Sequence, residues 1–442
     1  MTDRLEAWLE GRHAGHFDFP DDGPPTFTYS DSAPATPISL SLPRGGRSTV
    51  KAASNFLENL LPDHDVTRER MATAYGAASP RTFDLLVTAG GDIAGGLVLT
   101  PEGQDVPSTS MAIYPALDQD IATRIAAIKR DSDDWIPEGA EARFSLAGTQ
   151  GKFALAEIDG EWYWSNAGVP STHIAKPART DLRHLESAES SALTLARTVG
   201  VPAAPAEVAT FIDQTTFLTE RFDRVCVGDE VRRLHAEDLA QALGTGPKEK
   251  YEVDLGSVAR LLRSADTTGQ LLRDFLRQLV FNVVIGNADA HAKNYSVMLR
   301  PDSVTLSPLY DAVPVMLYPR FNQKLAMKVS GAEHAQAIQR PLWVKQARAI
   351  GFDPDEMVDI VSDVAGKVGE HNDGAWTGLD DAQARTLRDG IGRNVDVALA
   401  RTPRTVEKTR PTGGQRRRPA GDTSGGQYAP QDHTPPEVTL GG

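Results

Sequence analysis

Three polar side chains in the second half of the chain have the types and spacing of a phosphoryl-transfer site. Asn294 follows Asp289 by five residues, and Asp311 comes after a predicted strand pair over 295–306. A kinase catalytic loop uses this Asp-to-Asn spacing for its base and a metal ligand. Carboxylate and amide oxygens are ligands that Mg²⁺ prefers. We predict that Asp289 is a catalytic base and that Asn294 and Asp311 hold Mg²⁺, although the spacing alone also fits an ordinary loop.

A long helix must position this loop. Apolar residues recur at helical spacing over 271–284, and the pattern ends at Gly286, a residue type typical of a helix C-terminus. Asp289 lies just beyond that end, where a loop carboxylate can reach a ligand. The order of helix, loop, hairpin and carboxylate is more specific than the Asp–Asn spacing by itself.

Lys176 and Glu189 form a second predicted pair. Lys176 shares a strand face with Thr172 and Ile174, and Glu189 lies on the apolar stripe of a predicted helix over 185–199. Lys176 could simply extend its amine to solvent at the strand end. A buried carboxylate, however, requires a cationic partner. We therefore expect the strand-lysine to helix-glutamate pair that positions ATP phosphates in kinases.

A glycine-containing loop lies between two predicted strands, 143–146 and 152–158. Its residues Ala147, Gly148, Thr149, Gln150, Gly151 and Lys152 could approach phosphate through backbone N–H groups, two polar side chains and one cation. The loop has neither the Walker A pattern nor the glycine pattern of ordinary protein kinases. Without its context it would be interpreted as a turn.

Composition places the chain among multidomain globular proteins. It has 442 residues, 40% hydrophobic and 24% charged, and no apolar segment long enough to span a membrane. The single cysteine, Cys226, excludes an internal disulfide and fits a cytoplasmic location. The net charge is −14, but residues 401–442 hold seven basic and four acidic side chains. An acidic body argues against a large nucleic-acid surface, and the tail is predicted to be disordered and basic.

The order of predicted elements divides the chain into five parts. Residues 1–105 predict a small α+β unit, with a strand over 38–42 and helices near 53–61, and a polar connection covers 106–140. A strand-rich lobe over 141–225 precedes a helical lobe over 226–400, and the basic tail follows. The fold class is therefore α+β, a two-lobed kinase-like fold with an additional N-terminal domain.

At this point the chain resembles the HipA-type serine/threonine kinases, the toxins of two-gene toxin–antitoxin modules. The resemblance extends in order over about residues 1–400. The segments that carry it are Ser39-Leu-Ser-Leu-Pro43, Phe56-Leu-Glu-Asn-Leu-Leu-Pro62, Phe83-Asp-Leu-Leu86, Arg143-Phe-Ser-Leu-Ala-Gly-Thr-Gln-Gly-Lys152, Ser171-Thr-His-Ile-Ala-Lys-Pro177, Glu220-Arg-Phe-Asp-Arg224, Arg233-Leu-His-Ala-Glu-Asp-Leu-Ala-Gln-Ala-Leu243 and Gly286-Asn-Ala-Asp-Ala-His-Ala-Lys-Asn294.

The resemblance implies further roles. Residues 147–152 would form the nucleotide loop, and Ser145 matches the autophosphorylated serine of the family. The remaining nucleotide contacts would be Lys176, the hinge residues Glu220, Arg221 and Phe222, the loop residues His291, Ala292, Lys293 and Asn294, and finally Tyr310 and Asp311. Family members use Mg²⁺–ATP and bind a small helix-turn-helix antitoxin that contacts operator DNA, so DNA would be met only indirectly. Several phosphorylate a protein target that is an aminoacyl-tRNA synthetase.

Two positions depart from the family pattern, and two other functions stay open. Gly151 replaces a residue that is commonly acidic, and Ala188 replaces an expected Asn before Glu189. The same base and metal ligands would also serve a small-molecule phosphotransferase. A catalytically silent relative could instead act as a co-repressor with its antitoxin.

Overall fold

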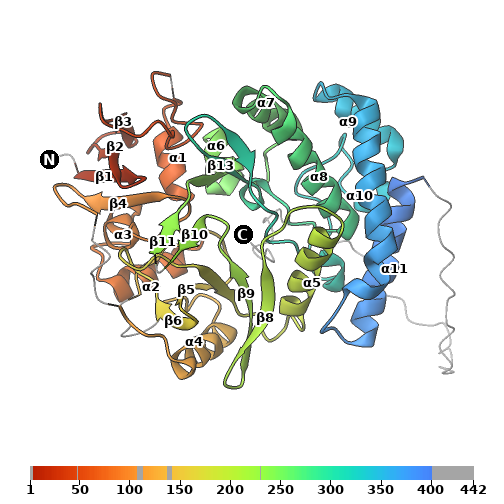
Figure 1. The fold of residues 1–442 in the computed structure, drawn as a ribbon, viewed down its shortest axis with the longest axis horizontal. Helices are drawn as coiled ribbons and strands as arrows, with labels where there is room; N and C mark the ends of the chain where they lie inside the picture. Colours follow the sequence, from red (N-terminus) through yellow and green to blue (C-terminus); the bar gives the residue numbers. More distant parts are fainter. Residues whose placement is uncertain (1–2, 47, 107–112, 137–141, 229, 401–442) are drawn as a thin grey trace, which may run out of the picture.

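The computed structural model describes residues 3–46, 48–106, 113–136, 142–228 and 230–400. The predicted disordered basic tail over 401–442 lies outside the described residues, as does part of the connection over 106–140. Figure 1 shows the N-terminal sheet at one end of the molecule and helices α9, α10 and α11 at the other.

The N-terminal unit is a four-stranded antiparallel sheet with three helices. Its strands follow the order β3-β2-β1-β4. Phe17 of β2 and Phe56 of α1 are both buried and stack with ring centroids 6.1 Å apart, which fixes the helix on the sheet. The elements are β1 Asp3–Leu9, β2 Arg12–Phe19, β3 Thr26–Tyr29, α1 Ala52–Glu58, α2 Asp65–Tyr75, α3 Thr82–Ala89 and β4 Leu97–Pro101.

The strand predicted over 38–42 is wrong. This segment forms only an isolated bridge between Ser39 and Leu42. The Ser39 hydroxyl accepts the backbone N–H of Ser41 over 3.0 Å, and serine side chains that bond the nearby backbone favour turns. The alternation of apolar and polar residues therefore buries Ile38 and Leu42 without forming a sheet.

The connection contains a helix that the sequence pattern did not predict. Helix α4 spans Asp118–Arg130 and buries Ile121, Ile125 and Ile128. These residues recur at i, i+4 and i+7, so one face of the helix is apolar. They join a core that also contains Leu5 of the N-terminal sheet and Phe153 of the next lobe. The N-terminal unit and the strand-rich lobe thus share one hydrophobic core.

A five-stranded antiparallel sheet forms the small lobe, in the order β6-β5-β7-β9-β8. The strand predicted over 143–146 is wrong, because its amides bond to separate partners: Arg143 to the Ser165 carbonyl and Ser145 to the Asp92 carbonyl. The elements are β5 Phe153–Ile158, β6 Glu161–Trp164, β7 His173–Lys176, α5 Leu185–Thr198, β8 Ala206–Phe211 and β9 Gln214–Glu220. A separate hairpin follows, with strands β10 Arg224–Val227 and β11 Glu230–Arg233.

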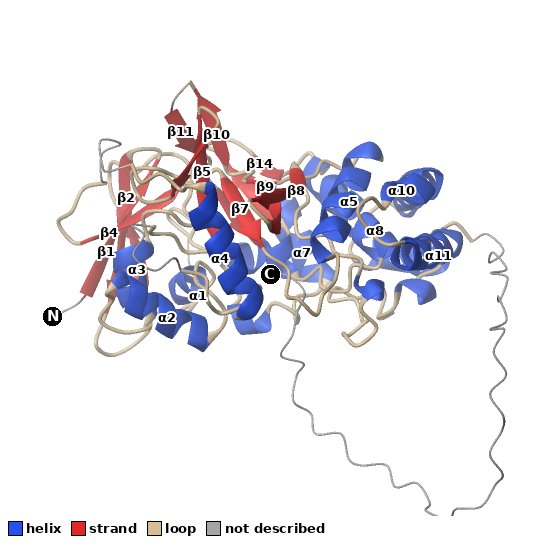
Figure 2. Ribbon diagram, turned by 90° about the horizontal axis from the view of Figure 1, so that it is seen from below, coloured by secondary structure: helices blue, strands red, loops and turns tan. Residues whose placement is uncertain are grey.

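The large lobe is mainly helical and has its own core around α8 and α10. A three-stranded sheet, β12-β13-β14, lies between the lobes and includes the predicted hairpin. Figure 2 shows α10 and α11 side by side at the end remote from the N-terminal sheet. The elements are β12 Ala236–Asp238, α6 Leu239–Leu243, α7 Leu255–Ala265, α8 Gln270–Ile285, β13 Ser296–Leu299, β14 Val304–Leu306, α9 Arg340–Ala349, α10 Pro354–Ala375 and α11 Asp381–Ala398.

Candidate active site

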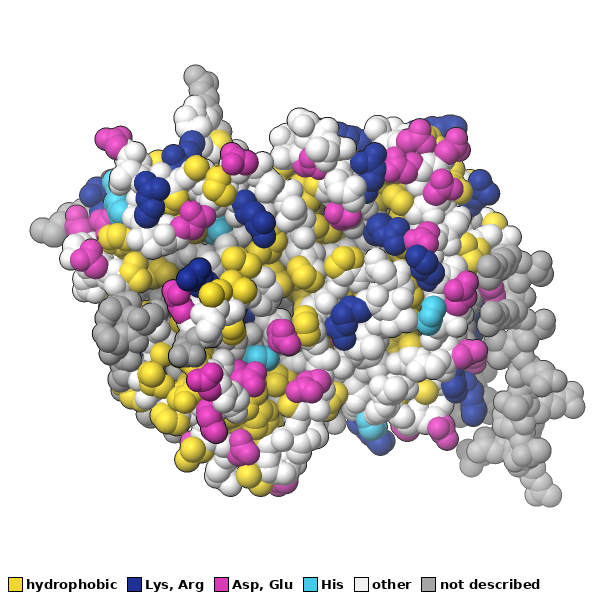
Figure 3. Space-filling model, in the orientation of Figure 1, with side chains coloured by type: hydrophobic (Ala, Val, Ile, Leu, Met, Phe, Trp, Pro, Cys, Tyr) yellow, Lys and Arg dark blue, Asp and Glu magenta, His cyan; other side chains and the backbone are white. Residues whose placement is uncertain are grey.

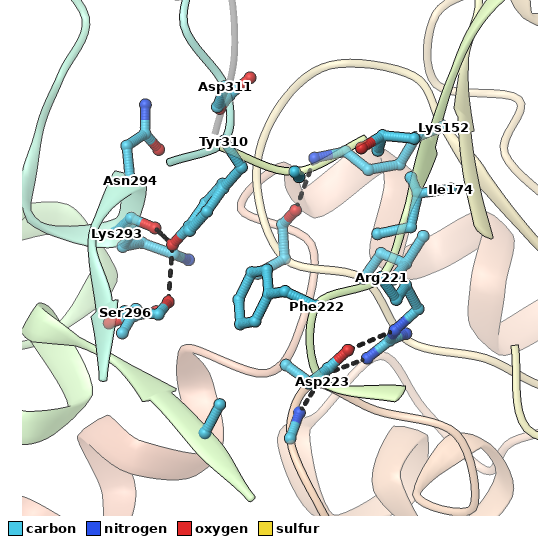
Figure 4. Close-up of a pocket in the computed structure, with 18 of the residues that line it drawn as sticks. Lys152, Ile174, Arg221, Phe222, Asp223, Lys293, Asn294, Ser296, Tyr310 and Asp311 are labelled. Atoms are coloured by element: carbon cyan, nitrogen blue, oxygen red, sulfur yellow. Dashed lines mark hydrogen bonds and ion pairs between the residues drawn. The ribbon is translucent and has the colours of Figure 1, made fainter. Parts of the chain in front are cut away.

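A cavity of about 160 Å³ lies where the small lobe, the large lobe and the N-terminal unit meet. Figure 4 shows side chains from all sides of this cavity facing one another. Eleven of the predicted site residues line it: Ala147, Lys152, Lys176, Glu189, Glu220, Arg221, Phe222, Lys293, Asn294, Tyr310 and Asp311. The fold therefore gathers residues from six separate sequence segments into one cleft.

Lys176 lies between two buried carboxylates. Its Nζ is 3.0 Å from Glu189 Oε1 and 2.7 Å from Asp311 Oδ1. Burial opposes a charged lysine, but Asp311 and Glu189 together raise the pKa of Lys176 above its ordinary value. We define Lys176, Glu189 and Asp311 as the cleft cluster. The contact expected between Lys176 and Glu189 is present, and Asp311 joins it.

The pKa values of the two carboxylates in the cleft cluster are shifted in opposite directions. Burial raises the pKa of Glu189 to about 7, although Lys176 acts in the opposite direction. Burial also acts on Asp311, but there Lys176, and then Lys152, hold the pKa below its usual value. Asp311 is thus the carboxylate that stays ionised and can bind a cation.

The catalytic loop begins at the C-terminal end of α8. Gly286 ends that helix with φ +73°, a left-handed backbone conformation that strains any residue with a side chain and so favours glycine. Asp289 is half-buried, and its Oδ1 accepts a hydrogen bond of 2.7 Å from the Tyr251 hydroxyl. Asn294 Nδ2 donates to the backbone oxygen of Asp289 over 3.0 Å. This bond engages the amide nitrogen and leaves the amide oxygen as the atom for a cation.

The nucleotide loop is held against the N-terminal unit. The carbonyl of Gly148 accepts the N–H of Asp63 over 3.0 Å. A Cβ atom at Gly151 would lie 2.7 Å from the Ser132 carbonyl, so the backbone following α4 leaves no space for a side chain. This contact explains why glycine replaces the acidic residue expected at this position. Gly148, Thr149, Gln150 and Gly151 do not line the cavity.

Lys152 is the buried cation of this loop. Its Nζ donates to the Ala147 carbonyl over 2.8 Å and lies 5.5 Å from the centroid of the Trp135 ring. Burial, together with the nearby charge of Lys176, lowers the pKa of Lys152 to about 7. A bound phosphate would favour its charged form.

The hinge residues divide between the cleft and the N-terminal unit. Phe222 stacks on Tyr310 with ring centroids 5.3 Å apart, and Tyr310 donates to the Lys293 carbonyl over 2.7 Å (Figure 4). An aromatic pair of this kind suits a flat base. The Arg221 guanidinium instead binds both carboxylate oxygens of Asp223, over 2.9 and 2.7 Å. Its side chain is therefore engaged in a structural pair.

Several predicted residues lie beside the cavity without lining it. Asp289 lies half-buried in the catalytic loop, and His291 and Ala292 are fully buried. Burial, and then the charge of Lys250, lower the pKa of His291 well below its usual range, so its ring is neutral. Ser145, the predicted autophosphorylation site, is 1% exposed, and its hydroxyl donates to the Leu60 carbonyl over 2.7 Å.

Other lining residues were not assigned a role from the sequence. Those from the N-terminal unit and from the segment at β12 and α6 include Asn59, Gly95, Glu237, Asp238 and Gln241. The Asp238 carboxylate accepts the N–H of Gln241 over 2.8 Å and caps α6. Burial raises the pKa of Glu237 to about 8. The sequence did contain a signal for the residues at β12 and α6, because 233–243 is one of the segments that carry the family resemblance.

The donor set in the cleft fits Mg²⁺. Within the described ranges, no group of three or more His, Cys, Asp and Glu side chains could hold a metal ion. Asn294 and Asp311 supply one amide and one carboxylate oxygen. Mg²⁺ accepts such a set, because it keeps waters and substrate phosphates as its other ligands. The residues therefore fit a cation that arrives with a nucleotide.

Two further expectations concern a nucleic-acid surface and a membrane-spanning segment. On the face drawn in Figure 3, basic and acidic side chains are interspersed over the helical half, without a single extended basic patch. Among the residues that the structure describes, no helix is both long and apolar enough to cross a membrane.

Comparison with protein families gives two matches. The family model for the HipA-like C-terminal domain matches residues 144–371, and the one for the HipA N-terminal domain matches residues 5–100. Together they include the cleft and most of the N-terminal unit.

Individual relatives agree with these matches. A Sinorhizobium fredii protein named "Putative kinase Y4mE" is 34% identical over 74% of this chain and 81% of its own length. The serine/threonine-protein kinase toxin HipA of Shewanella oneidensis is 31% identical over 66% of this chain and 70% of its own length. A solved complex of Shewanella oneidensis HipA, HipB and operator DNA contains a chain that superposes with a TM-score of 0.76 and 25% identity, over 90% of this chain and 98% of that one.

Proposed function

Because this chain belongs to the HipA-like family of kinase toxins, we propose that it is a serine/threonine protein kinase and the toxin of a toxin–antitoxin module. The observation that carries the proposal is the cleft cluster, in which Lys176 bridges Glu189 and Asp311. In kinases a strand lysine, a helix glutamate and a metal-binding aspartate together position the ATP phosphates.

ATP would bind along the cleft. Phe222 and Tyr310 offer an aromatic surface for the base, and Lys176 and Lys152 face the region in which phosphates would lie. Asn294 and Asp311 would hold Mg²⁺, which would supply positive charge to offset part of the charge of the phosphates. Together these residues would hold the γ-phosphoryl group near the catalytic loop.

Asp289 would then act as the base. It accepts the proton of the acceptor hydroxyl as the hydroxyl oxygen bonds to the γ-phosphorus. The bond from that phosphorus to the bridging oxygen breaks, and ADP leaves. A base of this kind contributes about 10²–10⁴-fold to the rate.

We also propose autophosphorylation at Ser145. Its hydroxyl is buried against Leu60, so residues 145–152 must first leave their place. A phosphate of about −1.5 to −2 charge could not return to that buried position. Phosphorylation would therefore keep the nucleotide loop out of the cleft and inhibit the enzyme.

The proposed partners follow from the structural neighbour. A chain that superposes well on this one forms a complex with HipB and operator DNA. We propose that a helix-turn-helix antitoxin binds this chain in the cytoplasm, and that DNA is contacted through that antitoxin. The proposed target is a protein, and an aminoacyl-tRNA synthetase is the first candidate to test.

The test is phosphoryl transfer from Mg²⁺–ATP by the purified full chain, recorded as intact mass. Wild type is expected to gain one phosphoryl group on Ser145, and Asp289→Asn none. Asp302→Asn, in the exposed turn between β13 and β14, is the matched control and should behave as wild type. Transfer by Asp289→Asn would reject Asp289 as base. No transfer by an unmodified wild type, to itself or to a synthetase, would favour a small-molecule phosphotransferase or a silent co-repressor.

A further inference from the structure

The segment that follows α6 reaches back to the catalytic loop. The Tyr251 hydroxyl donates to Asp289 Oδ1 over 2.7 Å. The Tyr251 ring meets the His291 ring edge-on, with centroids 4.9 Å apart. The backbone is joined as well, because the N–H of Ala292 donates to the Lys250 carbonyl over 3.3 Å. Three contacts of different kinds therefore hold Tyr251 against the loop that contains the base.

A carboxylate of the N-terminal unit fixes this segment from the other side. Asp63 Oδ2 is 2.9 Å from Lys250 Nζ, and Asp63 Oδ1 is 3.0 Å from Lys293 Nζ. Lys250 and Lys293 are each 5% exposed, so both pairs are largely removed from water. Buried pairs depend strongly on each partner. Lys250, the neighbour of Tyr251, is thus held in one place.

Tyr251 itself is 40% exposed. A hydrogen bond at such a position competes with water unless its donor is already oriented. The ring contact with His291 and the anchored Lys250 supply that orientation. A fixed phenol can therefore define how the Asp289 carboxylate is turned, which a mobile side chain could not.

We infer that Tyr251 is a positioning residue for the catalytic base. Its hydroxyl holds the Asp289 carboxylate in the orientation that receives the proton of the acceptor, and Asp63 and Lys250 hold Tyr251 in place. The inference rests on the proposed function, since it takes Asp289 as the base. Small errors in the placement of a reacting group are costly in rate, so Tyr251 would act on the transfer step and not on nucleotide binding.

The test uses Tyr251→Phe, which keeps the ring and removes the hydroxyl. Phosphoryl transfer by the full chain is measured at saturating Mg²⁺–ATP, and ATP affinity is measured separately by titration. We expect the rate to fall about tenfold while the Kd for ATP stays within about twofold. Tyr29→Phe is the matched control, because the Tyr29 hydroxyl also donates over 2.7 Å, to the Leu42 carbonyl, far from the base.

Lys250→Met tests the support of Tyr251. It should slow transfer in the same direction, and the double variant with Tyr251→Phe should be no slower than Tyr251→Phe alone, because both changes remove one function. An unchanged or faster rate in Tyr251→Phe would overturn the inference, and the faster rate would show that the phenol blocks the base. Lost ATP affinity at an unchanged rate would overturn it as well. Absence of transfer in wild type would instead reject the proposed function.

Discussion

Two buried clusters of charge lie near the hinge, and they differ in how their charges are matched. In the cleft cluster, one lysine serves two carboxylates, Glu189 and Asp311. The second cluster, which we call the interface cluster, joins the hinge to the N-terminal unit through Arg221, Asp223, Arg224 and Asp92. There two arginines meet two carboxylates. Burial of charge is common to both, so burial alone does not identify a catalytic group.

The two clusters differ in whether their positive and negative charges balance. The interface cluster is balanced, and its arginines also donate to backbone carbonyls of Ile93 and Gly95. In the cleft cluster one carboxylate lacks a partner of its own, and burial raises the pKa of Glu189 to about 7. A metal cation can supply the missing positive charge there. We therefore expect the interface cluster to contribute mainly stability and the cleft cluster mainly activity.

The largest effect is expected from Arg224→Met in the interface cluster. It leaves Asp92 and Asp223 buried with one cation fewer, which should lower the free energy of unfolding by about 3–5 kcal/mol. Chemical denaturation measures this change, and transfer by the folded fraction should stay within about threefold of wild type. Arg232→Met is the control in the same hairpin, because its pair with Glu230 is 57% exposed on both sides and should contribute less than about 1 kcal/mol.

Lys176→Met, in the cleft cluster, should have the opposite outcome: a large loss of activity and a smaller loss of stability. Loss of a cation that faces the phosphates should reduce the transfer rate about 10²–10³-fold. Stability should fall less than in Arg224→Met, because Glu189, with its pKa already raised to about 7, can take up a proton and remove the unpaired charge. Rates and denaturation of both variants are compared side by side, with the exposed Lys324→Met as control. A stability loss larger than that of Arg224→Met at an unchanged rate would contradict the comparison.

The sequence made the cleft cluster more predictable than the interface cluster. Lys176 and Glu189 lie on adjacent elements with clear periodic patterns, and Asp311 follows a recognisable hairpin. The pair of Arg224 with Asp92 joins residues 132 positions apart, and no local pattern brings Asp92 there. In the same way, the type of Ser145 was informative, but its burial against Leu60 depends on the N-terminal unit.

The prediction of secondary structure failed where backbone amides donate to several separate acceptors and not to one neighbouring strand. Residues 38–42 and 143–146 have strand-like alternation, yet their amides bond to different segments and form no ladder. Helix α4 is the opposite case, since its isoleucine spacing was a readable signal within a segment judged by its polarity. Local patterns thus predicted the elements better than the segments that join them.

A smaller effect, on the affinity for ATP, is expected from Lys152. Because burial lowers its pKa to about 7 in the free protein and phosphates favour the ammonium form, ATP binding should raise that pKa and take up a proton. Affinity should then be highest below pH 7 and fall as the pH rises above 7, by at most about tenfold per pH unit. Titrations from pH 6 to 9 measure this slope. Lys152→Met should flatten it, whereas Lys345→Met on α9 should not; a slope common to all three proteins would belong to the nucleotide.

The smallest effect on stability is expected from Ser145→Ala, at the start of the nucleotide loop. The Ser145 hydroxyl donates to the Leu60 carbonyl, and its backbone N–H donates to the backbone carbonyl of Asp92, whose carboxylate belongs to the interface cluster. The substitution removes only the first bond and should lower the free energy of unfolding by about 1 kcal/mol. It should also abolish the mass gain in Mg²⁺–ATP while transfer to a protein target continues. A phosphate mapped to another residue would show that inhibition does not act through this loop. An unchanged free energy of unfolding would show that water replaces the lost hydroxyl. The start of the nucleotide loop is thus anchored to the backbone of Leu60 and Asp92, and release of Ser145 for phosphorylation must break both bonds.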